Sequence, residues 1–529
     1  MTTDPNALFR RAEQAFKQGD PGAAKADITR LRRLVGDHPA VLRLHARIEQ
    51  ALGDVAASRA LFEQVMRIAP GDADGWMEMA LFLRSIDALA EAADAIARAI
   101  AIRPNSPHLR HIEARIALER GHADAPGLYQ RLRKSVPDDL GMLLGEAAAR
   151  FQNDDGTGAA ALLDEATAAR PDWLEGLNAA ARLRWQLGAG EAFAEPYRRA
   201  LAVRRNDPIL WASYLGAVGS TLGHQKVLEE LPSARLAAGA HDLFDKLEAS
   251  ALTETAQHDA AAELFARIDC LADPSFGLVY LRHLLRCRKA EEASAFGQQL
   301  LSRGAGYEVW PYLSIAWRLL GDPRWDWLDR GSDLISVQDL AELEPLLPDL
   351  TEVLRGLHTA RVHPFEQSPR GGTQTDGALL ARDEPEIRAL RDILHAAVAR
   401  HAEGLPPVEP DHPILGRPRT GLRFAGSWSV RLTGEGFHVS HVHTRGWISA
   451  ALYVSLPQSL GDGTHGHDGW LALGAPPAEL GLDDLKPVRL VEPKPARLVL
   501  FPSIMWHGTL PFAEGERLTV AFDATPSGR

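Results

Sequence analysis

A repeat of 31 to 37 residues runs through the first 330 residues of this chain and constrains its fold more than any other feature. Prolines close successive segments, and glycines punctuate the turns between them. Amphipathic patterns fill the intervals, so we expect each repeat to be a helix pair. A lone pair cannot bury its apolar face, and stacked neighbours must supply the core. The marker residues are Pro39, Pro70, Pro104, Pro137, Pro171 and Pro208, with Gly19, Gly53, Gly121, Gly188 and Gly223.

The period is close to the roughly 34 residues of tetratricopeptide repeats. The clearest unit runs from Trp76 to Pro104, where Ala80, Ala92 and Ala99 let paired helices approach closely. We count about six clear repeats and three weaker ones, and predict a tetratricopeptide solenoid over residues 1–330. The concave surface of a solenoid typically binds a protein or peptide. Packing of the array on the rest of the chain, or dimerisation, is the alternative, so a homo-oligomer stays open.

Residues 331–529 show a different pattern. Pro, Gly and Thr interrupt the helical periodicity over 363–375, and an amphipathic helix is expected over 383–405. Beyond Pro406 the chain reads as short apolar strands separated by glycine-rich turns. Many short strands after a helical block favour a β-sandwich or jelly roll. We therefore predict a multidomain α plus β protein, with a β-rich domain over 331–529.

Three histidines lie close together before one of these strands, at His438, His441 and His443. Neutral imidazoles bind first-row transition metals, and His441 and His443, two apart on an extended segment, project to one face. His507 follows a distant strand and would close a facial set with open coordination positions. Arg517, ten residues later, would hold a carboxylate by a charge-assisted bidentate pair.

This arrangement resembles the iron(II)- and 2-oxoglutarate-dependent dioxygenases, which carry a His-x-Asp/Glu pair, a distal His and then an Arg that binds the 2-oxoglutarate carboxylate. More narrowly, the chain is similar to a bacterial group of 2-oxoglutarate/iron oxygenases fused to tetratricopeptide repeats. The resemblance covers roughly residues 355 to 526. The motifs that carry it, in order, are GTQT, SWSVRL, GFHVSHVH, GWISAALYVSLP, LVLFPSIMWHGTLPF and ERLTVAFD.

The resemblance implies a double-stranded β-helix, a form of jelly roll, with Fe(II), the cosubstrate 2-oxoglutarate and O2 as its cofactors. It implies catalytic roles for His441, His507 and Arg517. The 2-oxoglutarate site would contain Arg517, Thr519, Tyr453 and Arg431. For Arg431 a simple salt bridge, and for Tyr453 plain packing, are the structural alternatives. Residues expected near the substrate are Gln367, Arg370, Gln374, His438 and Trp447.

One residue departs from the family pattern, because His443 stands where the carboxylate ligand belongs. His443 itself coordinates the metal in the interpretation that we favour, with His441 and His507 as the other ligands. In a second interpretation water completes a two-histidine site. In a third, a carboxylate arrives from the glycine-rich loop, where Asp462 and Asp468 are the candidates.

Composition excludes several other classes of protein. A net charge of -12 leaves no basic surplus to neutralise phosphates, which argues against a nucleic-acid partner. With Cys270 and Cys287 as the only cysteines, no disulfide framework is expected. The sequence shows neither an apolar signal core at its start nor a run of about 18 apolar residues. We therefore expect a cytoplasmic protein without a membrane partner.

Three functions are compatible with these patterns. The first is an iron(II)/2-oxoglutarate-dependent dioxygenase that hydroxylates a protein or peptide recruited by the repeats. The second is a non-catalytic tetratricopeptide scaffold with a degenerate oxygenase domain, which the missing carboxylate would explain. The third is a three-histidine dioxygenase that does not use 2-oxoglutarate. Arg517 together with Thr519 favours the first function over the third.

Overall fold

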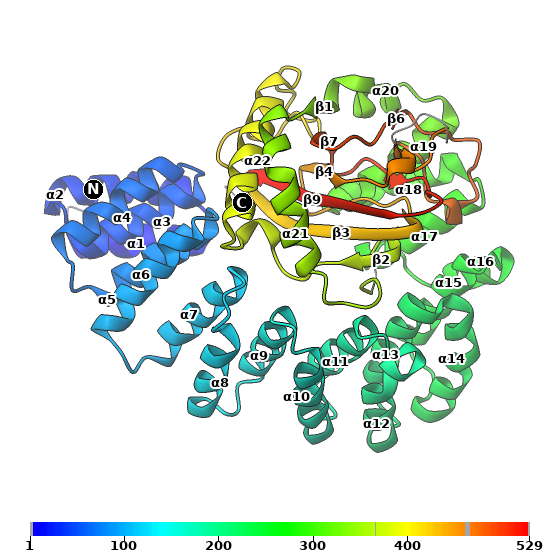
Figure 1. The fold of residues 1–529 in the computed structure, drawn as a ribbon, viewed down its shortest axis with the longest axis horizontal. Coiled ribbons are helices and arrows are strands. Elements are labelled where there is room, and N and C mark those ends of the chain that lie inside the picture. The colour runs from blue at the N-terminus through cyan, green and yellow to red at the C-terminus, as the bar shows by residue number, and fades with distance from the viewer. Residues whose placement is uncertain (1–3, 366, 461–465, 527–529) are drawn as a thin grey trace.

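The computed structural model describes residues 4–365, 367–460 and 466–526. A helical solenoid starts at the N-terminus and curves around one side of a β-rich body (Figure 1). The solenoid helices are α1 (Pro5–Lys17), α2 (Pro21–Val35), α3 (Pro39–Ala51), α4 (Val55–Ile68), α5 (Ala73–Ser85), α6 (Leu89–Ile102), α7 (Pro107–Glu119), α8 (Ala125–Ser135), α9 (Leu140–Gln152), α10 (Gly156–Ala169), α11 (Leu174–Gln186), α12 (Glu195–Val203), α13 (Pro208–Leu222), α14 (His224–Ala238), α15 (Asp242–Glu254), α16 (His258–Phe265), α17 (Pro274–Arg286), α18 (Ala290–Ser302), α19 (Trp310–Leu320) and α20 (Arg324–Asp329).

Each helix pair turns at one residue in the left-handed backbone region. Glycine reaches this conformation without a steric penalty because it lacks a Cβ, and Gly53 and Gly121 have φ of 82° and 66°. Where glycine is absent, residues such as Asp87 keep the same turn, with φ of 62°. In the described residues the series is Gly19, Gly53, Asp87, Gly121, Asp154, Gly188, Gly223, Ala256, Arg288 and Gly321. The repeat therefore continues to α20, through units that the sequence pattern marks only weakly.

Aspartate side chains begin many of the solenoid helices. The carboxylate of Asp20 accepts a hydrogen bond from the Ala23 amide at 2.9 Å, and Asp54 accepts one from Ala57 at 2.9 Å. Each cap satisfies an amide that has no partner within its helix and contributes about 1 kcal/mol. Part of the acidic surplus of the chain therefore defines where its helices start.

The β-rich body contains two antiparallel sheets. The larger has the strand order β1-β7-β4-β9-β3-β2, and the smaller has the order β6-β5-β8. The two face each other across a shared cluster of apolar residues, as a jelly-roll fold requires. The strands are β1 (Ser336–Asp339), β2 (Pro369–Gln374), β3 (Leu422–His438), β4 (Ile448–Ser455), β5 (Leu471–Leu473), β6 (Arg489–Val491), β7 (Arg497–Pro502), β8 (His507–Thr509) and β9 (Glu516–Pro526).

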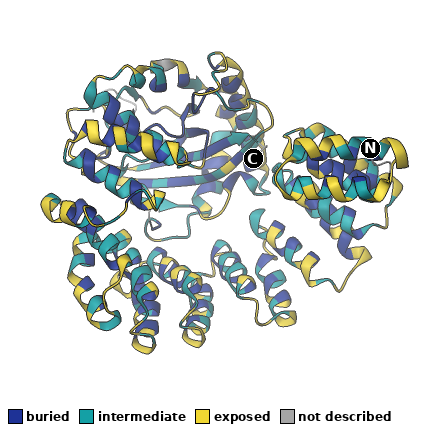
Figure 2. Ribbon diagram, turned by 180° about the vertical axis from the view of Figure 1, so that it is seen from behind, coloured by how far each residue is buried: buried dark blue, intermediate teal, exposed yellow. Residues whose placement is uncertain are grey.

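Alternation along the strands gives the larger sheet two different faces. One face packs residues such as Leu452 and Phe522 against the helices α21 (Leu347–Gly356) and α22 (Pro385–Gly404). The opposite face points toward the smaller sheet. The central strands β4, β7 and β9 are largely buried, whereas the solenoid helices expose their outer sides (Figure 2). The helix expected over 383–405 corresponds to α22.

The apolar core does not end where the helical repeat ends. The last solenoid helix finishes at Asp329 and β1 begins at Ser336. Leu313 and Trp317 of α19 nevertheless belong to the same buried cluster as Leu452. The end of the solenoid and the β-rich body are therefore packed as one unit.

The solenoid also contacts the β-rich body along its inner side. These contacts come from several separate repeats, so the array follows the body over much of its length. This geometry supports the alternative in which the array packs on the rest of the chain. The contacts include the Phe424 amide with Asp87 Oδ2 (3.1 Å), Arg120 Nε with Asp383 Oδ2 (2.8 Å) and Trp185 Nε1 with the His363 carbonyl (2.8 Å).

Cys270 and Cys287 are both free thiols. Among the helices that the structure describes, none is long and apolar enough to cross a membrane.

Candidate metal centre

A short backbone pairing brings together two histidines that lie far apart in the sequence. The His441 amide donates to the His507 carbonyl at 2.9 Å, and the His507 amide donates to the His441 carbonyl at 3.0 Å. Directly opposed residues of an antiparallel pair place their side chains on one face. His443, two residues further along, donates its amide to the Ser503 carbonyl at 2.9 Å. Its side chain therefore shares the direction of His441.

The three imidazole rings gather at one point. One ring nitrogen from each of His441, His443 and His507 lies within 4.8 Å of the other two. The ring centroids are 4.2 Å apart for His441 and His507, and 4.9 Å apart for His441 and His443. The ring centroids of His443 and His507 are 5.0 Å apart. The structure thus brings together the three residues that the sequence predicts as metal ligands.

The other nitrogen of each ring faces a hydrogen-bond acceptor. An acceptor at Nδ1 requires a proton there, which leaves the lone pair on Nε2. Histidines that bind metals are typically held in this way by a carbonyl or a carboxylate. The Nδ1 atom of His441 lies 2.8 Å from the Val439 carbonyl, and that of His507 lies 2.9 Å from the Met505 carbonyl. The Nδ1 atom of His443 lies 2.7 Å from Asp523 Oδ1.

Asp523 is a site residue that the sequence analysis missed. It lies on β9, where it holds His443 and accepts a further hydrogen bond from Ser449 Oγ at 2.6 Å. A carboxylate is therefore present behind His443 rather than in the ligand set. The signal for it was the two-residue alternation of β9, since Arg517, Thr519 and Asp523 share one face.

Burial and mutual proximity keep two of these rings neutral. Burial, and then the neighbouring His443, lowers the pKa of His441 to about 3. Burial and the neighbouring His441 hold the pKa of His507 well below its ordinary value. The neutral ring is the form that offers a lone pair to a metal.

A histidine occupies the third position of the close set. Among the described residues, no carboxylate joins the three ring nitrogens, and Asp468 lies outside the set. Asp462, the other loop candidate, lies outside the described residues. The geometry therefore favours His443 as the third ligand over a carboxylate at Asp468.

Arg517 carries a buried charge that has no anionic partner among the described residues. Its side chain is fully buried, and Nη1 donates to the Gly469 carbonyl at 3.0 Å. Its Nε has no hydrogen-bond partner in the described part of the chain. Burial lowers the pKa of Arg517, and its guanidinium lies 5.1 Å from the centre of the Tyr453 ring. A buried cation without an anion is costly, so this buried region favours a negatively charged ligand.

Two hydroxyl groups lie on the same face as Arg517. Tyr453 and Thr519 stand opposite each other in the β4–β9 ladder. The Tyr453 hydroxyl is buried without a hydrogen-bond partner in the described residues, while Thr519 Oγ1 lies 3.5 Å from the Val430 carbonyl. Burial raises the pKa of Tyr453, so its hydroxyl keeps the proton and is available as a donor.

His438 connects the arginine with the histidine centre. Its ring stacks on His441, with centroids 6.0 Å apart and an interplanar angle of 21°. Its Nδ1 lies 2.9 Å from Ser368 Oγ. Burial, then His441, then the charge of Arg517 hold the pKa of His438 well below its ordinary value. Arg517 and the histidine centre share one buried region, because Tyr453, beside Arg517, packs in one apolar cluster with Phe501, whose ring centroid lies 4.7 Å from that of His507.

Arg431 does not face this region, which corrects the expectation that it binds the cosubstrate. In the β3–β9 ladder Arg431 stands opposite Leu518, whereas Leu432 stands opposite Arg517. A one-residue step moves a side chain to the other face of a sheet. On that face Arg431 Nε pairs with Glu516 at 2.6 Å, as the salt-bridge alternative expects.

Trp447 also differs from its expected role near the substrate. It is 1% exposed within the apolar core, and its indole donates to the Ile414 carbonyl at 3.0 Å. Its polar atom is therefore satisfied away from the histidines. Trp428 instead approaches the centre, with its ring centroid 5.3 Å from that of His443.

The remaining expected substrate residues lie on or beside β2, the edge strand next to β3. Gln367 is exposed, and Arg370 Nη1 donates to the Gln367 and Pro369 carbonyls at 2.8 Å. Gln374 stands opposite Val430, on the face that carries Arg517. Of these residues, Gln374 therefore shares the inner face of the larger sheet.

Fold and site together define a class of protein. A helical repeat is followed by a double-stranded β-helix that holds three convergent histidines and a buried arginine without an anionic partner among the described residues.

Comparison with known proteins makes this class more specific. Residues 426–523 match the family described as "Putative 2OG-Fe(II) oxygenase". This segment contains all three convergent histidines and Arg517. The chain therefore joins a helical repeat to a C-terminal segment that is similar to the 2OG-Fe(II) oxygenase family, which confirms the resemblance seen in the sequence.

One curated relative and two solved structures are similar to parts of the chain. The cellulose synthase 2 operon protein C of Komagataeibacter xylinus is 31% identical over 179 residues, which are 32% of this chain and 13% of that protein. A tetratricopeptide repeat protein from Parabacteroides merdae is 9% identical with a TM-score of 0.35, covering 46% of this chain and 97% of that one. A prolyl-4-hydroxylase from Pseudomonas putida is 21% identical with a TM-score of 0.24, covering 36% of this chain and 92% of that one.

Proposed function

We propose that residues 331–529 are an iron(II)/2-oxoglutarate-dependent dioxygenase that hydroxylates a protein or peptide substrate recruited by the solenoid of residues 1–330. One observation carries this proposal. A fully buried guanidinium, that of Arg517, lacks an anion among the described residues and lies in the same buried region as three convergent imidazoles. A metal bound by neutral ligands beside an unpaired cation fits an anionic, metal-chelating cosubstrate.

The histidine set fits a ferrous ion. His441, His443 and His507 would each bind it through Nε2, because their Nδ1 atoms already face acceptors. Three protein ligands leave coordination positions for cosubstrate and oxygen. Iron(II) with 2-oxoglutarate and O2 supplies the oxidising power to hydroxylate an unactivated C–H bond. Asp523 would fix the orientation of His443 and supply negative charge next to the metal.

The groups around Arg517 fit the remote carboxylate of 2-oxoglutarate. Arg517 would bind that carboxylate through its unpaired edge, and the Tyr453 hydroxyl would donate a further hydrogen bond. Thr519 lies beside both on the same face. The cosubstrate would thus satisfy two polar groups that are buried without partners, which offsets part of the cost of their burial.

Aromatic side chains wall the histidine centre. The Phe501 ring lies 4.7 Å from that of His507, and the Trp428 ring lies 5.3 Å from that of His443. Apolar walls exclude water, which strengthens electrostatic contacts and protects reactive chemistry.

The edge of the larger sheet supports an extended peptide as the substrate. β2 is a terminal strand of that sheet and pairs with β3, which ends at His438. An edge strand offers backbone groups to which an extended chain adds by strand pairing. Arg370 and Gln374 lie on this strand, and Gln367 is just before it. The surface of the solenoid would supply further contacts to a protein substrate.

Succinate formation tests the proposal. Purified full-length protein is incubated with ferrous iron, O2 and 2-oxoglutarate, with and without candidate peptides, beside His507→Ala and the exposed-histidine control His38→Ala. We expect succinate from the wild type and His38→Ala but none from His507→Ala. Absence of succinate under every condition would favour the scaffold function. Oxygen consumption that is independent of 2-oxoglutarate would favour the three-histidine dioxygenase.

A further inference from the structure

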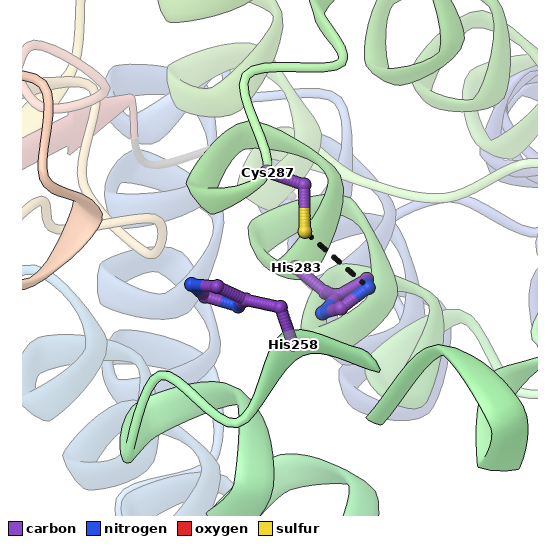
Figure 3. Close-up of side chains that lie close together, drawn as sticks. All are labelled: His258, His283 and Cys287. Atoms are coloured by element: carbon purple, nitrogen blue, oxygen red, sulfur yellow. Dashed lines mark hydrogen bonds between the residues drawn. The ribbon is translucent and has the colours of Figure 1, made fainter. Parts of the chain in front are cut away.

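A second group of metal-binding side chains lies in the solenoid, away from the centre described above. His258 is the first residue of α16, His283 lies in the last turn of α17, and Cys287 is the residue directly after that helix. One donor atom from each lies within 4.8 Å of the other two. Figure 3 shows the three side chains gathered between the two helices. Because residues four apart lie on one face of a helix, His283 and Cys287 form a natural pair of ligands.

The ring of His283 is already oriented for coordination. Thr253 Oγ1 donates to the Ala249 carbonyl at 2.8 Å, so its lone pairs remain free to accept a hydrogen bond from His283 Nδ1, 3.4 Å away. With the proton on Nδ1, the lone pair of His283 sits on Nε2. That atom faces the Cys287 sulfur at 3.6 Å.

The separation between these two atoms is the one that a tetrahedral metal requires. A zinc ion with Zn–N of about 2.05 Å and Zn–S of about 2.3 Å holds its nitrogen and sulfur ligands about 3.6 Å apart. His283 Nε2 and Cys287 Sγ already have this spacing. Binding at this pair therefore needs no rearrangement of α17.

His258 supplies an independent indication of a missing ligand. Its Nδ1 is buried and has no hydrogen-bond partner in the described residues. Its ring centroid lies 6.0 Å from that of His283. Packing against Phe265, 4.8 Å from His283 between ring centroids, explains why His283 is buried. Packing does not explain an unsatisfied imidazole nitrogen beside a thiol and a second imidazole.

We propose that His258, His283 and Cys287 bind a zinc-class divalent transition metal through two imidazole nitrogens and one thiolate. The Cys287 thiol releases its proton to solvent when the sulfur binds. The fourth position stays open to water, because the protein contributes three ligands. Thiolate with imidazole favours zinc or cobalt over harder ions such as magnesium. This site is independent of the function proposed for the C-terminal domain.

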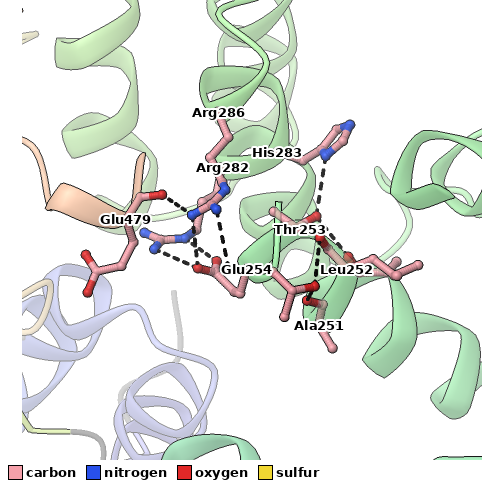
Figure 4. Close-up of polar contacts among 10 residues, drawn as sticks. Ala251, Leu252, Thr253, Glu254, Arg282, His283, Arg286 and Glu479 are labelled. Carbon is pink, nitrogen blue, oxygen red and sulfur yellow. Dashed lines mark hydrogen bonds and ion pairs between the residues drawn. The ribbon is translucent and has the colours of Figure 1, made fainter. Parts of the chain in front are cut away.

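The position of the site indicates what the metal does. His283 lies on α17 between Arg282 and Arg286, and both arginines pair with Glu254, next to Thr253 (Figure 4). Arg286 also donates to the carbonyl of Glu479 in the β-rich body. A metal that joins α16 to α17 would therefore stiffen the part of the solenoid that holds this body.

Cobalt spectroscopy on the full-length protein tests the proposal. The protein is stripped of metal and titrated with Co(II), and the thiolate-to-cobalt charge-transfer absorption is recorded. This signal is specific because the histidine centre of the β-rich body contains no cysteine. We expect saturation at one equivalent of thiolate-bound cobalt. The signal should vanish in Cys287→Ser and persist in Cys270→Ser and in His507→Ala.

A second variant keeps the proposal testable if Cys287→Ser does not fold. His258 begins a helix near the surface, and His258→Gln should keep the fold while weakening Co(II) binding at least tenfold. Circular dichroism checks the fold of each variant. A wild type without the charge-transfer signal, or a signal unaffected by Cys287→Ser, would overturn the metal site. Unchanged affinity in His258→Gln would overturn the three-ligand arrangement.

Discussion

The centre in the β-rich body and the cluster in the solenoid both bring three donor atoms within 4.8 Å of one another, yet they are built differently. In the β-rich body every ring has its Nδ1 held by a carbonyl or carboxylate. In the solenoid His283 is held by Thr253, while the buried nitrogen of His258 has no partner in the described residues. The first site is fixed before a metal arrives, whereas the second gains part of its order from the metal.

The charges that surround the histidine centre and the solenoid cluster also differ. The histidine centre lies beside Arg517, a buried cation without an anion among the described residues, which prepares the site for a charged ligand. The solenoid cluster lies beside Arg282 and Arg286, and both of these arginines form an ion pair with Glu254. Rigid ligands beside an unbalanced charge suit chemistry on a bound substrate. A cluster that joins two helices beside charges already paired within the protein suits a metal that stiffens the fold.

The largest expected effect is on succinate formation, which should depend on the histidine centre and not on the solenoid cluster. His441→Ala removes one ligand of the centre and should lower succinate formation by more than about 100-fold, because even the groups that hold a ligand are worth 10–100-fold. Succinate is measured with saturating iron and 2-oxoglutarate. His38→Ala, which removes an exposed histidine, should match the wild type. If Cys287→Ser also lost succinate formation, the histidine centre and the solenoid cluster would act as one unit. That result would contradict the separate roles given to them.

The second effect concerns the unbalanced charge of Arg517. Arg517→Met should raise the KM for 2-oxoglutarate by about 10–100-fold, since a charge-assisted hydrogen bond contributes about 1.5–3 kcal/mol. Without 2-oxoglutarate the same variant should be more stable than the wild type, by on the order of 1–3 kcal/mol, because a buried unpaired cation has been removed. Steady-state kinetics measures the KM, and denaturant titration without 2-oxoglutarate measures the stability. A destabilised variant would mean that Arg517 has an anionic partner in the protein.

The third effect compares the groups that hold the ligands. Asp523→Asn should weaken iron binding at the centre by about 10–100-fold, because the carboxylate both orients His443 and adds negative charge. Thr253→Val should weaken cobalt binding in the solenoid by less than about 10-fold, because its contact with His283 is neutral and long, at 3.4 Å. Competition with a coloured chelator gives both affinities. A larger effect at Thr253 than at Asp523 would reverse the ranking of the two sites.

The smallest expected effect concerns Arg431, which lies on the face of the larger sheet that is turned away from Arg517. Arg431→Ala should leave the KM for 2-oxoglutarate unchanged, although Arg431 stands next in register to the residue opposite Arg517. Its pair with Glu516 is partly exposed, so its loss should lower the free energy of unfolding by no more than about 1 kcal/mol. The two measurements are steady-state kinetics and denaturant titration. A raised KM would contradict the assignment of Arg431 to the face away from the cosubstrate.

Sequence reasoning worked best where the signal is local. The repeat of about 34 residues could be predicted because each helix pair contains a left-handed turn. Glycine, or a substitute such as Asp87, recurs at that turn. His441 and His443 share a face because an extended chain alternates with period two. Reasoning failed for Arg431 and Trp447, because the face that each side chain adopts depends on distant strands and helices.

The sequence by itself determined the helical repeat, the β-rich C-terminal region and the candidate ligands His441, His443 and His507, since period and motif are properties of neighbouring residues. Only the tertiary structure decided that Asp523 holds His443, that Arg517 lies buried without an anion among the described residues, and that His258 meets Cys287. These relations join residues that are distant in the chain. The register of the strands and the packing of the helices place them together, because an apolar core forms in only a few ways.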